Sequence, residues 1–137
     1  MTMTLEQCLF AYLSTHPQVS ALVADRIRPD LLEQDEPYPA IAYSLLDERD
    51  MLTQQGPSQL REALYQFDIW AERAKDAWAV RTALLSALGG IRTNMGDQPG
   101  IVAIFDKAAR TRDPETMAYC ISMRFRIFFH DSGAVPP

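Results

Sequence analysis

A helical pattern of apolar residues opens the chain and predicts a helix over residues 4–24. Thr4 and Gln7 fit a capping box, in which each side chain binds a free backbone amide of the first turn. Pro17 lacks an amide proton and disfavours helical geometry at His16, so we expect the helix to kink or restart there. The buried stripe is expected to contain Leu5, Cys8, Leu9, Tyr12, Leu13, Val19, Leu22 and Val23.

Strand-like alternation follows in the middle of the chain. Residues 40–46 are predicted to form a strand, and residues 47–64 a long β-hairpin arm whose turn centres on residues 55–58 (Gln-Gly-Pro-Ser). After the arm, an alternation with period two predicts that one face of the return strand is buried. The side chains expected on that face are Tyr65, Phe67 and Ile69.

The second half of the chain contains one more helix and two more strands. Residues 75–88 are predicted to be helical and to end at Gly89-Gly90, with a stripe that Trp78 widens. Residues 91–98 are expected to be a polar loop, 101–105 a strand, 111–116 a turn and 117–129 a long strand. The apolar face of that last strand is expected to consist of Tyr119, Ile121, Met123, Phe125, Ile127 and Phe129.

The order of these elements defines the expected fold class. Helix, strands, helix and strands follow one another without regular βαβ alternation, which predicts an α+β fold. We expect a mostly antiparallel sheet with two principal helices on one face and the hairpin arm extending from it. One domain is expected over residues 1–130, followed by a loose tail over 131–137. The expected core combines Tyr65, Phe67, Ile69, Phe125 and Ile127 with Leu9, Leu13, Leu84 and Leu88.

Composition excludes several classes of protein. Hydrophobic residues make up 47% of the 137 residues, which excludes general disorder, and no apolar run approaches the ~20 residues of a membrane-spanning helix. The first residues lack the features of a secretory signal, so an intracellular origin is expected. Thirteen basic against 18 acidic residues give a net charge of −5, which counts against a main function in gripping nucleic acid.

Residues of the types used in catalysis are few and scattered. Neither His16 nor His130 lies in a metal-binding motif, and both are expected to be surface or capping residues. Cys8 is expected to be a buried small apolar residue. Cys120 faces away from the aromatic side of the last strand, and whether it is buried depends on a neighbour covering that face. The acidic pairs in the loop and hairpin are expected to be solvated. We therefore expect no catalytic site, metal or cofactor.

Arginines near the end of the chain form one candidate contact surface. Arg124 and Arg126 are two residues apart on a strand, so they share a face, and Arg110 and Arg112 of the preceding segment could join them. Such a group would suit carboxylates of a partner or passing nucleic acid. A solvated sheet face explains the same pattern equally well.

The order of several short segments resembles a known family. These segments are Arg-Ile-Arg-Pro at 26–29, Pro-Tyr-Pro-Ala-Ile-Ala-Tyr at 37–43, a Gly-Pro-Ser hairpin, Gln-Phe-Asp-Ile-Trp-Ala at 66–71, an alanine-rich helix ended by Gly89 and Arg-Phe-Arg-Ile at 124–127. Together, over residues 5–130, they resemble the tail completion or tail terminator (head-to-tail joining) family of long-tailed bacteriophages. The positions that match the family (Arg26, Pro29, Pro39, Tyr43, Asp68 and Trp70) are of the fold-keeping kind.

The resemblance implies a structural role. Its members form a hexameric ring at the head-proximal end of the tail tube, stop tube polymerisation and offer a surface to the head connector, while DNA passes through the lumen. The implied partners are further copies of the chain, the tail tube protein and a neck protein, in a virion assembled in the host cytoplasm. Two alternatives remain: another neck or tube-like component, and a small ligand-binding α+β protein.

The hairpin arm is the expected contact between subunits. An isolated pair of strands is only marginally stable in water, so its outer half either flexes or packs on a neighbour. Mixed charge around a few apolar side chains suits an interface with a polar rim; a flexible solvated loop is the alternative. The expected interface residues are Asp47, Glu48, Arg49, Asp50, Met51, Leu52, Leu60, Arg61 and Glu62.

Overall fold

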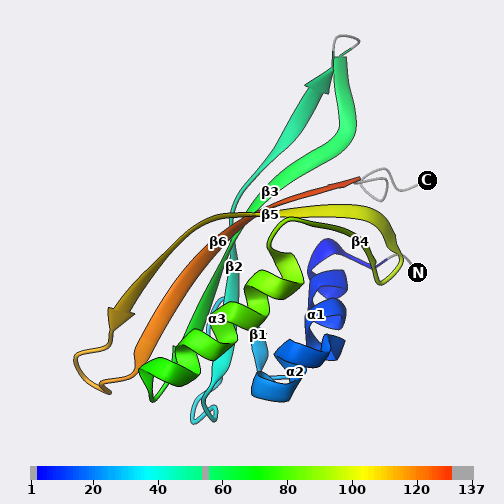
Figure 1. Cartoon of the computed structure of the whole chain (residues 1–137). Coiled ribbons are helices and arrows are strands. Elements are labelled where there is room, and N and C mark those ends of the chain that lie inside the picture. Colours follow the sequence, from blue (N-terminus) through cyan, green and yellow to red (C-terminus); the bar gives the residue numbers. More distant parts are fainter. Residues whose placement is uncertain (1–2, 54–55, 131–137) are drawn as a thin grey trace.

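A single six-stranded sheet organises the described part of the chain (Figure 1). The computed structural model describes residues 3–53 and 56–130, with the backbone alone at residues 52, 53 and 56–59. The elements are α1 (Leu5–Thr15), α2 (Pro17–Val23), β1 (Ile27–Pro29), β2 (Ala40–Thr53), β3 (Gly56–Ala71), α3 (Ala74–Leu88), β4 (Ile91–Met95), β5 (Gln98–Arg112) and β6 (Tyr119–His130). The strand order is β1-β2-β3-β6-β5-β4, and only the β1–β2 pairing is parallel.

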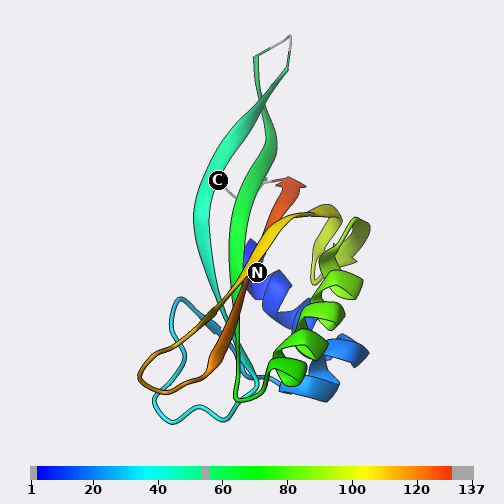
Figure 2. The same ribbon diagram turned by 60° about the vertical axis from the view of Figure 1, so that its left-hand side comes forward.

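The helices lie on one face of this curled sheet, which confirms the α+β prediction (Figure 2). The predicted first helix restarts at Pro17, so it becomes α1 and α2 with His16 between them. The capping box is present, because the Gln7 amide donates to Thr4 Oγ1 at 3.1 Å and the Thr4 amide donates to Gln7 Oε1 at 2.8 Å. Local sequence signals therefore define both helix starts.

The core lies between the helices and the aromatic face of the sheet. Phe67 of β3 and Phe125 of β6 are fully buried and meet edge-to-face, with ring centroids 5.7 Å apart. The helices contribute small and branched side chains to the same layer. The predicted core residues Leu9, Leu13, Tyr65, Phe67, Ile69, Leu84, Leu88, Phe125 and Ile127 are all buried.

Trp78 does not widen the buried stripe of α3 as predicted; 55% of its surface is exposed. Successive residues of a helix are rotated by roughly 100°, so the residue after the buried Ala77 lies at the side of the helix, next to the outer half of β5. The side of α3 that meets the sheet is rich in alanine, and such small side chains let a helix pack close to the strands. Its buried residues are Ala77, Val80, Ala83, Leu84, Ala87 and Leu88.

Two strand predictions in the second half were wrong. Residues 91–95 form edge strand β4 rather than a polar loop, and β5 spans residues 98–112 rather than 101–105. From Ile104 onward β5 is poorly covered: Phe105 is half-buried, and Ile104 and residues 106–112 are exposed. An exposed strand needs no apolar alternation, so the pairing with β6 determines its length instead.

The turn of the arm also differs from the prediction. Gly56, Pro57 and Ser58 already belong to β3, with Thr53 paired to Gly56 and Leu52 to Pro57. Gln55, the first residue of the predicted turn, lies outside the described residues, as does the predicted tail 131–137. At Pro57 the only described partner of β3 is β2, because β6 pairs with β3 from Leu60 onward, and proline is tolerated at such an edge.

Candidate assembly surfaces

Ion pairs between its own strands hold the inner part of the arm. Arg49 Nη2 lies 3.0 Å from Glu62 Oε2, and Asp50 pairs with Arg61; both pairs are directly opposite in the β2–β3 register. Exposed ion pairs of this kind contribute only ~0.2–1 kcal/mol each. They nevertheless favour this register of the two strands, so these four side chains stabilise the hairpin of their own subunit.

The remaining predicted interface residues differ in their accessibility. Asp47 and Glu48 are exposed on β2, whereas Met51 and Leu60 are half-buried and make contacts within the chain. The side chain of Leu52 lies outside the described residues. The prediction missed Leu45 and Leu46, which lie just before the acidic residues and are 42% and 43% exposed. A bulge between Leu45 and Asp47 interrupts the register here.

The predicted arginine group is divided between the two faces of the sheet. A bulge between Phe105 and Lys107 reverses the alternation of β5, so Arg110 and Arg112 point to the helix side, over the ring of Tyr119. Arg124 and Arg126 lie on the opposite, uncovered face of the sheet. The four arginines therefore do not form one patch, and a one-residue bulge is the reason.

A hydrogen-bond chain holds Arg124 on the uncovered face. Its Nε donates to Gln66 Oε1 at 3.1 Å, and Gln66 Nε2 donates to Asp68 Oδ1 at 3.0 Å. Ser122 Oγ donates to the same Asp68 oxygen at 2.7 Å. Arg126 is exposed, and its Nε lies 3.7 Å from Asp106 Oδ1. This face consequently carries mutually satisfied polar groups rather than a strongly basic surface.

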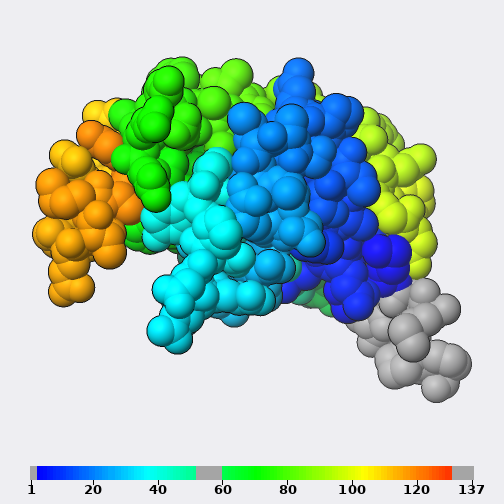
Figure 3. All heavy atoms as spheres, turned by 90° about the horizontal axis from the view of Figure 1, so that it is seen from below, coloured from blue at the N-terminus to red at the C-terminus, as the bar shows by residue number. Residues whose placement is uncertain are grey.

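Arg112 supports the turn between β5 and β6. Its Nε donates to the Met117 carbonyl oxygen at 3.0 Å. Seen from below, the tip of this hairpin and the loop over residues 30–39 project on either side of a notch (Figure 3). The notch is lined by Tyr38, Glu72, Arg112, Thr116, Met117 and Ala118 and has a volume of about 450 Å³. It is shallow and lacks a cluster of like charges that would favour an ionic ligand.

A small groove with a different composition lies between α3 and the outer half of β5. We call it the α3–β5 groove; it has a volume of about 260 Å³ and is lined by Trp78, Arg81, Ala108, Ala109, Arg110 and Ile121. The Arg81 guanidinium carbon lies 4.2 Å from the centroid of the Trp78 ring, close enough for a cation–π contact. Exposed tryptophan and arginine are typical of residues that dominate binding at protein interfaces. This surface was not predicted from the sequence. The signal that could have indicated it was Trp78, which follows directly after the first alanine of the buried stripe.

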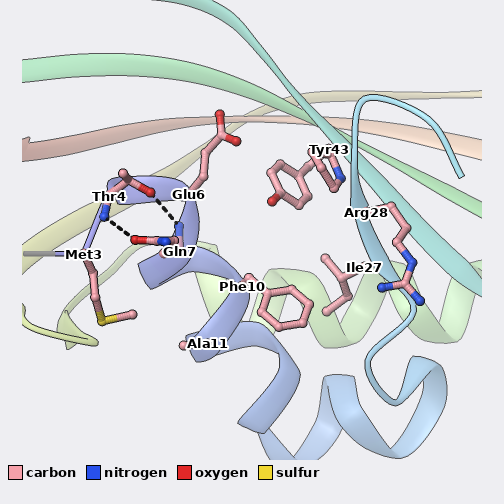
Figure 4. A pocket seen from close by; sticks show the side chains of 10 residues that line it. Met3, Thr4, Glu6, Gln7, Phe10, Ala11, Ile27, Arg28 and Tyr43 are labelled. Carbon is pink, nitrogen blue, oxygen red and sulfur yellow. Dashed lines mark hydrogen bonds between the residues drawn. The ribbon is translucent and has the colours of Figure 1, made fainter. Parts of the chain in front are cut away.

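A pocket of about 660 Å³ lies between α1 and β1 (Figure 4). Most of its charged and polar side chains have partners within the chain. Glu6 accepts a hydrogen bond from Tyr65 at 3.1 Å, and burial together with this carboxylate raises the pKa of Tyr65. Arg28 donates to Glu36 at 2.8 Å and thereby holds the pKa of that carboxyl below its usual range. Because Glu6 and Arg28 are engaged in these contacts, the pocket offers few free polar groups to a polar substrate.

The histidines and cysteines form no reactive centre in the described part of the chain. His16 occupies the N-cap position of α2, yet its side chain makes no capping bond there; its ring packs 5.8 Å from that of Tyr12. His130 is exposed at the end of β6. Both cysteines are buried, and burial raises the pKa of Cys8 and raises that of Cys120 to about 11.

We expect the native protein to react slowly with thiol reagents. With a pKa of about 11, roughly one Cys120 thiol in a thousand is ionised at pH 8, and thiolates are the reactive form. Alkylation at pH 8, followed by mass spectrometry, should label both cysteines at least about tenfold faster in denaturant than in buffer. Rapid, complete labelling of the native protein would show that the thiols are accessible.

The described residues contain neither a metal-binding cluster nor a helix that could cross a membrane. Nowhere in this part of the chain do three His, Cys, Asp or Glu side chains meet as a metal ion would require. None of its helices is long and apolar enough to cross a membrane.

An arm that projects from its sheet, exposed apolar side chains and pockets without convergent polar groups are typical of an assembly subunit. Residues 7–130 match the model of the family described as tail completion protein gp17. The chain belongs to this family and is a structural tail-completion protein of a phage-type virion.

A solved structure supports the fold. One chain of the "virion of native gene transfer agent (GTA) particle" superposes with a TM-score of 0.69 at 19% sequence identity, over 92% of this chain and 94% of that one. Among curated proteins, none is significantly similar.

Proposed function

We propose that six copies of this protein form a ring at the head-proximal end of the tail tube, where the ring ends tube polymerisation and offers the joining surface to the head. Membership of the tail completion family over residues 7–130 carries this proposal. Two features of the molecule support it. The arm projects beyond the sheet, and exposed apolar residues occur both at its base and on α3. Exposed apolar side chains that gather at one place are typical of surfaces that contact another protein.

The tail tube protein and a neck protein are the proposed partners on the two sides of the ring. Genomic DNA would pass through the lumen without being gripped, since six copies at −5 carry a total of about −30. The role is structural rather than catalytic. The uncovered sheet face, with its satisfied Arg124 chain, has no excess of unpaired cations that would trap DNA phosphates.

The proposal is tested by removing the gene and imaging the particles. Without the protein, tubes of irregular and excessive length and unjoined heads are expected, because nothing ends polymerisation. Supplying the protein in trans should restore both. Tubes of normal length joined normally to heads would contradict the proposal, and a tagged copy found elsewhere in the neck would favour a different neck component.

A further inference from the structure

Two stretches of sheet edge in this molecule have no partner among the described strands. β1 pairs with β2 only over residues 41–43, which leaves the outer edge of β2 open from Ser44 to Asp50. β4 pairs with β5 only up to Ala103, which leaves the outer edge of β5 open over residues 104–112. We call these stretches the β2 edge and the β5 edge. An open edge presents unpaired amides and carbonyls and is a template for another strand.

The two edges carry opposite charge. The β2 edge holds Asp47, Glu48, Arg49 and Asp50; because Arg49 pairs with Glu62 and Asp50 with Arg61, Asp47 and Glu48 carry its uncompensated negative charge. The β5 edge holds Lys107, Arg110 and Arg112 against Asp106 alone, and Asp106 already faces Arg126. The edges are also similar in length, at seven and nine residues. Attraction between them would favour contact between different edges and disfavour contact between like edges.

Exposed apolar side chains accompany both edges. Leu45 and Leu46 are 42% and 43% exposed on the β2 edge; Ile104 and Trp78, beside the β5 edge, are 46% and 55% exposed. These leucines are of a size to fit the α3–β5 groove, whose floor is apolar and whose rim carries Arg81 and Arg110. An apolar centre with a charged rim is the usual composition of a specific interface.

We infer that the β2 edge of one copy pairs with the β5 edge of the next, with Leu45 and Leu46 packed at the α3–β5 groove. The inference rests on the proposed ring and names the surface that receives the arm. Two different edges on opposite sides of one sheet give a head-to-tail contact, which can close into a ring. The alternative is that bulges and charges at both edges only prevent aggregation.

Charge reversal separates these readings. The acidic-edge variant carries Lys107→Glu and Arg110→Glu, and the basic-arm variant carries Asp47→Lys and Glu48→Lys. Either change places like charges opposite each other, so self-association, measured by analytical ultracentrifugation, should weaken about tenfold or more. Arg73→Glu with Arg92→Glu, both exposed and away from the two edges, makes the same charge change as the acidic-edge variant and should have little effect.

Mixing restores the complementary contacts. If each variant is impaired alone, an equimolar mixture should assemble, because every acidic edge meets a basic arm and every basic edge an acidic arm in an alternating ring. One chain carrying all four changes should assemble as well. Recovery in the mixture also shows that the variants are folded.

Each outcome is decisive for one of the two proposals. If the acidic-edge variant assembles like the unaltered chain, or the mixture fails to recover, edge pairing is overturned while the ring stands. If the edges pair but particles without the protein have normal tails, the ring function is overturned instead. Should the unaltered chain stay monomeric in solution, incorporation into tails becomes the readout, and equal incorporation of variant and parent overturns edge pairing.

Discussion

Replacing Phe67 by alanine is expected to lower the free energy of unfolding by about 3–5 kcal/mol, the usual cost of removing a buried aromatic ring. Phe67 is fully buried at the centre of the sheet. Its ring centroid lies 6.1 Å from that of Tyr43, 6.3 Å from Tyr65 and 5.7 Å from Phe125. Because strands on both sides contribute to this cluster, collapse around the missing ring would disturb β2 and β6 together.

Phe128 provides the matched control for this measurement. It lies on β6 with its side chain on the uncovered face, where it is half-buried, so Phe128→Ala should cost less than half as much. Urea denaturation followed by tryptophan fluorescence measures both losses. Equal losses would mean that the aromatic cluster is not the centre of stability.

Shortening the arm is expected to weaken ring assembly while leaving the subunit folded. Asp50 and Arg61 are directly opposite in the β2–β3 register, so replacing residues 51–60 by Asn-Gly closes the hairpin with a two-residue turn. Little stability should be lost, because β6 pairs with β3 only from Leu60 onward and the removed strands pair mainly with each other. Denaturation curves measure the folding, and electron microscopy of tails measures the assembly.

The control for the shortened arm changes only the two residues between Thr53 and Gly56 in the sequence. Replacing Gln54-Gln55 by Asn-Gly keeps the length of the arm and should leave assembly intact. If the shortened variant capped tails as well as the parent does, the outer half of the arm would be a solvated hairpin, and the subunit contact would be confined to residues outside it, such as the β2 edge.

Elements with a clear period were predictable from sequence. The stripes of α1 and α3 and the alternation around Phe67 and Phe125 reflect burial against a single core. Burial of one face makes apolar residues recur in the sequence with the period of the helix or of the strand. The N-terminal cap of α1 and the restart of the helix at Pro17 were equally predictable, because both depend only on residues that are close in the sequence. The segments that carried the family resemblance belong to the same class of local signals.

Elements stabilised mainly by their neighbours were not predictable. β4 and the outer half of β5 are held by pairing and leave many side chains in water, so their sequences resemble loops. The bulge between Phe105 and Lys107 was not predictable either, because no glycine or other characteristic residue marks it in the sequence. Yet it places Arg110 and Arg112 on the face of the sheet opposite to Arg124, so the predicted arginine group is not formed.

By itself, the sequence determined the α+β class, the core, the helix boundaries near caps and prolines, and the absence of a familiar catalytic motif. These depend on which residues must leave water and on hydrogen bonds between close neighbours in the chain. Only the tertiary structure decided which charges are used within the arm, which arginines share a face and which strand edges stay open. Those properties follow from register, where a shift of one residue moves every later side chain to the other face of the sheet.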